Sequence, residues 1–172
     1  MNKIKIKDVA ITAIFAAVIA ATAWISIPIP IGVNLTLQIF GVCLAGFYLG
    51  AKRGIAATAV YIVMGAVGLP VFSFFTSGVG VLLGTSGGFL LGFLFTAFLC
   101  GLSVKINSKL LKITTIFSAV LICHIIGVIQ FCLVSGVNIL AAFLSASLPF
   151  LPKDIIVAFV ASFVAQKIKK LN

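Results

Sequence analysis

One charged pair lies apart from the basic clusters of this chain. Lys153 and Asp154 are adjacent at the head of the last apolar run, whereas the other eleven Lys and Arg residues fall in four short clusters between apolar runs. A few polar groups among apolar walls are what a small-molecule pocket requires. The alternative is a simple interfacial ion pair, with Asp154 near a helix N-terminus where the helix dipole favours a carboxylate.

Few other side chains could carry acid–base chemistry. Asp8, Asp154 and His124 are the candidates, and Asp8 is expected on the opposite face from Asp154. We therefore expect no acid–base pair, no nucleophilic triad, no metal cluster, no cofactor and no enzyme activity. His124 lies within an apolar run, where a neutral imidazole bonded to a neighbouring helix is expected and a proton relay is the alternative.

The composition places these residues in a membrane. With 63% hydrophobic and 8% charged residues and a mean hydropathy of +1.38, the chain has too much apolar surface to hide from water. A bilayer core of about 30 Å takes roughly 20 apolar residues per helix, which allows about six spans. The sequence predicts an all-α integral membrane protein, multi-pass in the cell membrane, with one membrane-embedded domain over residues 1–172.

Proline, glycine and charge mark the ends of the expected helices. These are Val9–Ile27, Leu35–Gly50, Ile55–Val67, Phe89–Val104, Ile113–Val134 and Asp154–Ala165, with a short interfacial helix over Ile139–Ala146. The basic clusters are Lys3/Lys5/Lys7, Lys52/Arg53, Lys105/Lys109/Lys112 and Lys167/Lys169/Lys170. With six spans, all four clusters share one face, which the positive-inside rule makes cytoplasmic. Both termini are then cytoplasmic, and the net charge of +10 reflects topology, not nucleic-acid binding.

The connection between the third and fourth expected helices is rich in glycine and phenylalanine. Residues 68–88 contain six glycines and three phenylalanines. Backbone this irregular is not tolerated against lipid, so it must lie at the interface or line a cavity. On this outer side it joins the Lys153–Asp154 pair and the polar residues Asn34, Thr36 and Gln38.

Small residues form a stripe on the first expected helix. Ala13, Ala17 and Ala21 recur every four residues, with Ala16 and Ala20 beside them. Small residues at this spacing let another helix approach closely in lipid. The neighbour is either a helix of the same chain or a partner protein.

Several motifs follow one another in a characteristic order. They are Ile27-Pro28-Ile29-Pro30 with Gly32 to Gln38, then Gly46 to Gly54, Tyr61, Gly68 to Phe72, and Gly84 to Phe93. Along nearly its whole length the chain thereby resembles the biotin-specific substrate-binding (S) component of energy-coupling factor (ECF) transporters, the BioY family. The first motif is similar to the family's Pro-x-Thr-Leu-Gln loop. The family pattern Gly-Pro-Thr-Gly-Gly-Tyr is Gly84 to Phe89 here, where Ser86 keeps a hydroxyl and Phe89 lacks that of the tyrosine. In the family's Pro-Gly-Asp-x-x-Lys pattern Asp154 matches, but Val157 replaces the lysine. Lys153, one helical turn before Val157, is the hypothetical substitute for that lysine.

The resemblance implies a transporter subunit that binds biotin on its outer face and works with a transmembrane coupling protein and two cytoplasmic ATPases. The implied substrate-binding residues are Asn34, Thr36, Gln38, Phe72, Thr85, Ser86, Gly87, Gly88, Phe89, Lys153 and Asp154. The alanine stripe (Ala13, Ala16, Ala17, Ala20 and Ala21) is the expected partner interface. The alternatives are an S component for another vitamin, a self-sufficient carrier or channel, and an intramembrane enzyme.

Cysteine labelling tests the expected orientation. In a background without native cysteines, a cysteine placed near Ser145 should react with a membrane-impermeant reagent added outside intact cells. A cysteine placed near Asn107 should not react, because the two positions are expected on opposite faces of the membrane. The reverse pattern would contradict the topology.

Overall fold

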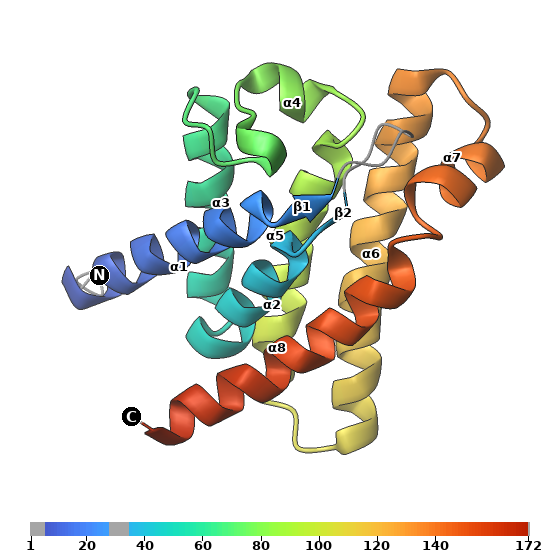
Figure 1. Ribbon diagram of the computed structural model, residues 1–172. Helices are drawn as coiled ribbons and strands as arrows, with labels where there is room; N and C mark the ends of the chain where they lie inside the picture. The colour runs from blue at the N-terminus through green and yellow to red at the C-terminus, as the bar shows by residue number, and fades with distance from the viewer. Residues whose placement is uncertain (1–5, 28–34, 172) are drawn as a thin grey trace.

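The described residues of the computed structural model, 6–27 and 35–171, fold into a bundle of helices (Figure 1). The helices are α1 Ile6–Trp24, α2 Gln38–Leu49, α3 Ala51–Ala66, α4 Val79–Leu83, α5 Gly87–Ser103, α6 Lys109–Ser135, α7 Ile139–Ala146 and α8 Leu151–Leu171. A 3₁₀ turn, η1 Ser73–Phe75, and a two-stranded hairpin, β1 Ser26–Ile27 with β2 Leu35–Thr36, complete them. The expected all-helical fold is confirmed.

The hairpin shortens the two helices that flank it. The first helix ends at Trp24 and not at Ile27, because Ser26 and Ile27 pair antiparallel with Thr36 and Leu35. The same pairing delays the start of α2 to Gln38. Residues 28–34, which include the expected outer loop and Asn34, lie outside the described part of the chain.

The basic clusters lie more within helices than the sequence predicts. Lys52 and Arg53 belong to the first turn of α3, because the chain turns two residues before Lys52, at Gly50, where φ is +81°. The α6 helix begins at Lys109, since the Ser108 hydroxyl accepts a hydrogen bond from the Leu111 N–H (3.4 Å) and caps it. The α8 helix continues to Leu171 and takes in the last three lysines.

The helices differ in length and apolar character. Among the described residues, α1 and α6 are long and apolar enough to cross a membrane, and α7 with α8, bent by 52°, adds a third candidate. The apolar helices α2 and α5 are shorter. These elements indicate a membrane protein, and the count of six spans stays a prediction.

Small residues bring the central helices close together. The α5 helix packs against α2, α3 and α6, and α2 also contacts α1 and α8. Alanines that are at most 2% exposed fill these contacts, among them Ala45, Ala97, Ala119 and Ala161. Close helix approach of this kind supplies van der Waals contact where lipid offers no hydrophobic driving force.

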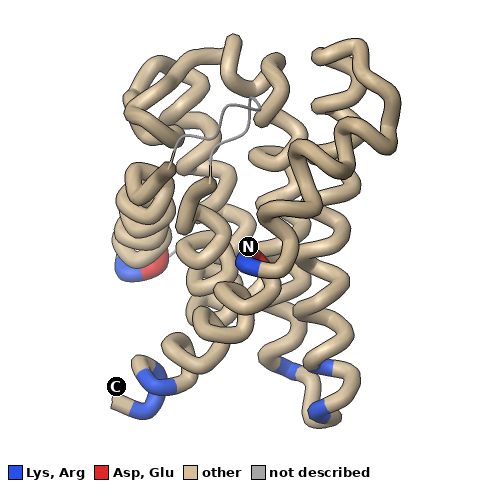
Figure 2. The backbone as a smooth tube through the Cα atoms, turned by 45° about the vertical axis from the view of Figure 1, so that its right-hand side comes forward, with Lys and Arg blue, Asp and Glu red and all other residues tan. Residues whose placement is uncertain are grey.

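The two ends of the bundle have different chemistry. The β-hairpin, η1, α4 and α7 gather at one end, shown at the top of Figure 1. The basic residues at the start of α6 and at the end of α8 lie at the opposite end (Figure 2). Two of the four basic clusters therefore lie away from the polar loops.

Replacing Gly88 by alanine should loosen the contact between α5 and α6. A Cβ atom at Gly88 would lie 2.5 Å from the Ile126 carbonyl oxygen and 2.8 Å from the Gln130 Cβ, so the helices must move apart. We expect a loss of about 1–3 kcal/mol, seen as a lower melting temperature in detergent. Gly80→Ala is the matched control, since Gly80 is also helical and nothing lies within 4 Å of its added Cβ. Equal melting temperatures for both variants would contradict this packing.

Candidate functional site

A cavity lies among the loops and helix ends at the end of the bundle that carries the hairpin, α4 and α7. Its enclosed volume is about 90 Å³, and the space reaches about 730 Å³ when the open mouth and the solvent in it are included. The lining residues are Thr36, Gln38, Ile39, Phe72, Ser73, Val81, Ser86, Phe89, Leu90, Phe93, Cys123, His124, Ala146, Phe150, Lys153 and Asp154. Nine of these sixteen residues are apolar and seven are polar or charged, a mixture that suits a small molecule.

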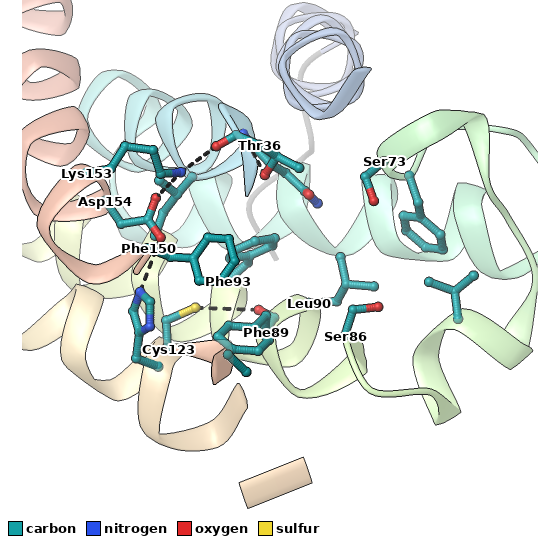
Figure 3. A pocket seen from close by; sticks show the side chains of 16 residues that line it. Thr36, Ser73, Ser86, Phe89, Leu90, Phe93, Cys123, Phe150, Lys153 and Asp154 are labelled. Carbon is teal, nitrogen blue, oxygen red and sulfur yellow. Dashed lines mark hydrogen bonds and ion pairs between the residues drawn. The ribbon is translucent and has the colours of Figure 1, made fainter. Parts of the chain in front are cut away.

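Seven of the eleven predicted substrate-binding residues line this cavity. They are Thr36, Gln38, Phe72, Ser86, Phe89, Lys153 and Asp154. Figure 3 shows Lys153 and Asp154 at one end of the cavity and Ser73 and Ser86 at the other. Thr85, Gly87 and Gly88 are not among the lining residues, and Asn34 lies outside the described residues.

The Lys153–Asp154 pair is built into the first turn of α8. Asp154 is 8% exposed, and its Oδ1 lies 2.5 Å from the Lys153 Nζ. The same ammonium donates a hydrogen bond to the Thr36 carbonyl oxygen (2.5 Å), which links α8 to the hairpin (Figure 3). Removing one partner of a buried pair leaves an uncompensated charge, so the two side chains hold each other in place.

His124 joins this pair from the middle of α6. Its Nε2 lies 3.2 Å from the Asp154 Oδ2, and its Nδ1 lies 2.8 Å from the Ser147 hydroxyl. The expectation of an imidazole bonded to a neighbouring helix is confirmed. The expectation that the chain forms no acid–base pair is wrong, because packing α6 against α8 brings together residues thirty positions apart. Asp8 is separate and pairs with Arg53 (2.9 Å).

Gly87 and Gly88 act in packing, at the start of α5. Both are buried, and the Gln130 side chain of α6 crosses this turn. Its Nε2 donates to the Leu82 and Gly84 carbonyl oxygens at 2.7 and 2.9 Å. The glycine-rich connection is therefore fixed to α6, and the two glycines leave room for that contact.

Phe72 forms part of the cavity wall. It is 1% exposed, and its ring meets Tyr61 edge-on with 5.5 Å between the centroids. The Tyr61 hydroxyl accepts a hydrogen bond from the Gln38 Nε2 (2.6 Å). Tyr61 thus holds the Gln38 side chain through one of its amide N–H groups.

Sequence reasoning missed the apolar residues that α5, α6 and the α7–α8 connection contribute. Phe93 lies one turn after Phe89 on α5, so the helical period could have indicated it. Cys123 and Phe150 carry no signal that separates them from other apolar residues. Their place in the wall depends on how α5, α6 and α8 pack.

The arrangement can bind a small polar ring without chemical change. Asp154 offers an acceptor and Lys153 a donor side by side, and phenylalanine rings surround them. Within residues 6–27 and 35–171, no group of three His, Cys, Asp or Glu side chains could hold a metal ion. The geometry favours reversible binding.

Comparison with known proteins identifies the family of this chain. The model of the BioY family matches residues 1–172. The probable biotin transporter BioY of Pyrococcus horikoshii is 35% identical over 165 residues, which cover 96% of this chain and 98% of that protein. The biotin transporter BioY of Thermotoga maritima is 40% identical over 161 residues, covering 92% and 94%. The crystal structure of the S-component for biotin from an ECF-type ABC transporter superposes with a TM-score of 0.87 at 28% identity, covering 99% of this chain and 94% of that one. The chain belongs to the BioY family.

Proposed function

We propose that this chain is the substrate-binding component of an ECF transporter and takes up biotin across the cell membrane. The observation that carries the proposal is the Lys153–Asp154 pair, with a buried carboxylate and a partly exposed ammonium, in a cavity that is also lined by four phenylalanines. Relatives named biotin transporters cover nearly the whole chain, which supports the same ligand here. Equilibrium binding of biotin to the purified protein tests the proposal, and tighter binding of another vitamin would replace it.

The polar groups of biotin complement those of the cavity. Its cyclic urea presents N–H donors beside a carbonyl acceptor, so Asp154 would accept from an N–H and Lys153 would donate to the carbonyl oxygen. Phe89 and Phe93 would contact the sulfur-containing ring, since thioether sulfur packs favourably against aromatic rings. Ser86, at the other end of the cavity, would serve the polar end of the side chain.

One face of α1 is the proposed docking surface for the transmembrane coupling protein. Ala13, Ala17 and Ala21 are exposed, whereas Ala16 and Ala20 are buried against the bundle. The stripe thus divides into an internal half and a free half, and only the free half is available to a partner. Two cytoplasmic ATPases complete the proposed complex and would act through the coupling protein.

The proposed topology has six spans with both termini in the cytoplasm. Its support is the position of the basic ends of α6 and α8 at the end of the bundle away from the cavity (Figure 2). The positive-inside rule assigns that end to the cytoplasm and the cavity to the outside. A ligand would then enter from outside the cell.

Asp154→Asn should weaken biotin binding. The substitution removes a charge-assisted acceptor from a largely buried site, which costs about 1.5 to 3 kcal/mol, or roughly ten- to hundredfold in affinity. Lys153→Met should have a comparable effect, and Val157→Lys should restore binding to the Met variant if Lys153 replaces the family lysine. Titration calorimetry with biotin measures both effects.

Asp8→Asn is the matched control for these variants. Asp8 is also a paired carboxylate, but its partner is Arg53 and it does not line the cavity. Its substitution should leave biotin affinity unchanged. Unchanged affinity for both Asp154→Asn and Lys153→Met would reduce the pair to an interfacial ion pair and remove the main physical support for this pocket.

Ala17→Phe should reduce transport and spare binding. A bulky side chain on the exposed half of the stripe blocks close helix approach by a partner. Uptake of labelled biotin by cells that contain the complete transporter should fall severalfold, while the purified chain binds biotin normally. Ser118→Phe, an equally exposed position on α6, is the control and should change neither. Loss of both binding and uptake in Ala17→Phe would instead indicate internal packing.

A further inference from the structure

We infer that His124, held by Ser147, is a positioning residue that fixes the Asp154 carboxylate for an N–H donor of the ligand. The inference rests on the proposed function and adds a residue to its site. His124 is 4% exposed and Ser147 is 1% exposed, so neither side chain is free to turn toward water. They continue the chain of contacts that begins at Thr36 and Lys153 and reaches Asp154.

The hydrogen-bond roles within this chain follow from the carboxylate. A carboxylate can only accept, so the His124 Nε2 must carry the proton that is shared with the Asp154 Oδ2. The Nδ1 of a neutral imidazole is then an acceptor, and the Ser147 hydroxyl, 2.8 Å away, can donate to it. Ser147 thereby supports the tautomer that the carboxylate selects.

The two oxygens of Asp154 have different partners: Oδ1 forms an ion pair with Lys153 but has no hydrogen-bond partner among the described residues, whereas Oδ2 is hydrogen-bonded to His124. Two fixed contacts define the plane of the carboxylate, whereas one would let it rotate about the Cβ–Cγ bond. Each oxygen keeps a further lone pair, and Asp154 lines the cavity, so a ligand N–H can be accepted there without loss of either contact.

The backbone fixes Ser147 at the bend between α7 and α8. Its carbonyl oxygen accepts hydrogen bonds from the N–H groups of Phe150 and Leu151 (3.0 and 2.9 Å), which start the first turn of α8. The Asp154 N–H in turn bonds to the Phe150 carbonyl oxygen at 2.9 Å. Ser147 and Asp154 therefore belong to one hydrogen-bonded bend, and His124 bridges them from α6. The geometry of the ligand acceptor is set before a ligand arrives.

A mutant cycle with Asp154 tests this role. His124→Leu removes the donor and should weaken biotin binding roughly tenfold, as expected for a lost hydrogen bond to a charged group. His124→Gln can still present an N–H to Asp154 and should recover most of that loss. In an Asp154→Ala background, His124→Leu should have almost no further effect, because its action passes through the carboxylate. Equal losses in both backgrounds would overturn the inference.

Thr96→Val is the matched control for the cycle. Thr96 is fully buried between α5 and α6, and its hydroxyl donates to the Gly92 and Ala119 carbonyl oxygens, both at 3.2 Å. It does not line the cavity, so its loss should change melting temperature and leave biotin affinity unchanged. An affinity loss in Thr96→Val as large as in His124→Leu would show that any buried polar change disturbs the site, and would overturn the specific role of His124.

The ligand-free protein gives a second test that does not depend on biotin. The chain contains one histidine, so ¹⁵N-labelled histidine reports on His124 alone. We expect a protonated Nε2 and an unprotonated Nδ1, with the Nε2 signal shifted by Asp154→Ala and the Nδ1 signal shifted by Ser147→Ala. The inference would be overturned by an unprotonated Nε2, or by nitrogen signals that neither substitution shifts. Wild-type protein that fails to bind biotin would instead refute the proposed function, while the nitrogen signals still decide whether His124 holds Asp154.

Discussion

The Lys153–Asp154 pair in an apolar helix bundle constrains the elements that pack around it. The Asp154 carboxylate is nearly removed from water, and in such surroundings each charge needs a partner of good geometry. Lys153 and His124 supply two partners, and Lys153 also needs the Thr36 carbonyl oxygen. These requirements tie α8, α6 and the β-hairpin together at one point. The cavity lies where these three elements meet, so the residues at its polar end also hold these elements together.

Close helix packing surrounds this meeting point. Gly88 and Gly92 of α5 lie against the backbone of α6, and Gly92 meets Cys123, the residue before His124. On its other side α6 contacts α8, where His124 reaches Asp154 at 3.2 Å. The α6 helix is thus packed between α5 and α8 at the level of the site, although neither glycine lines the cavity.

The sequence predicts those parts of the fold that depend on local pattern. Apolar runs and proline predict α7 over Ile139–Ala146 and Pro152 in the first turn of α8, and both agree with the structure. Pairing between distant segments is invisible to such reasoning: the β-hairpin shortens α1, and His124 meets Asp154 across thirty residues. Gly87 and Gly88 were expected in the site on the strength of their motif. Both glycines lie against the Gln130 side chain. A motif residue can therefore support the site through packing although it does not line the cavity.

One element connects the cavity to the exposed alanines. At the end of α1, the Trp24 Nε1 donates to the Pro70 carbonyl oxygen (3.0 Å), and its ring stacks on Phe75 with 5.1 Å between centroids. Phe74 and Phe75 both have positive φ values, 54° and 57°, a conformation that costs of the order of 1–3 kcal/mol per residue unless its surroundings hold it. The contact with Trp24 is one of the restraints that hold it. Because Phe72, three residues before Phe75, forms part of the cavity wall, the exposed face of α1 and the cavity are joined through a single strained turn. A displacement of the Trp24 end of α1 would therefore act first on this turn, and through it on the wall residue Phe72.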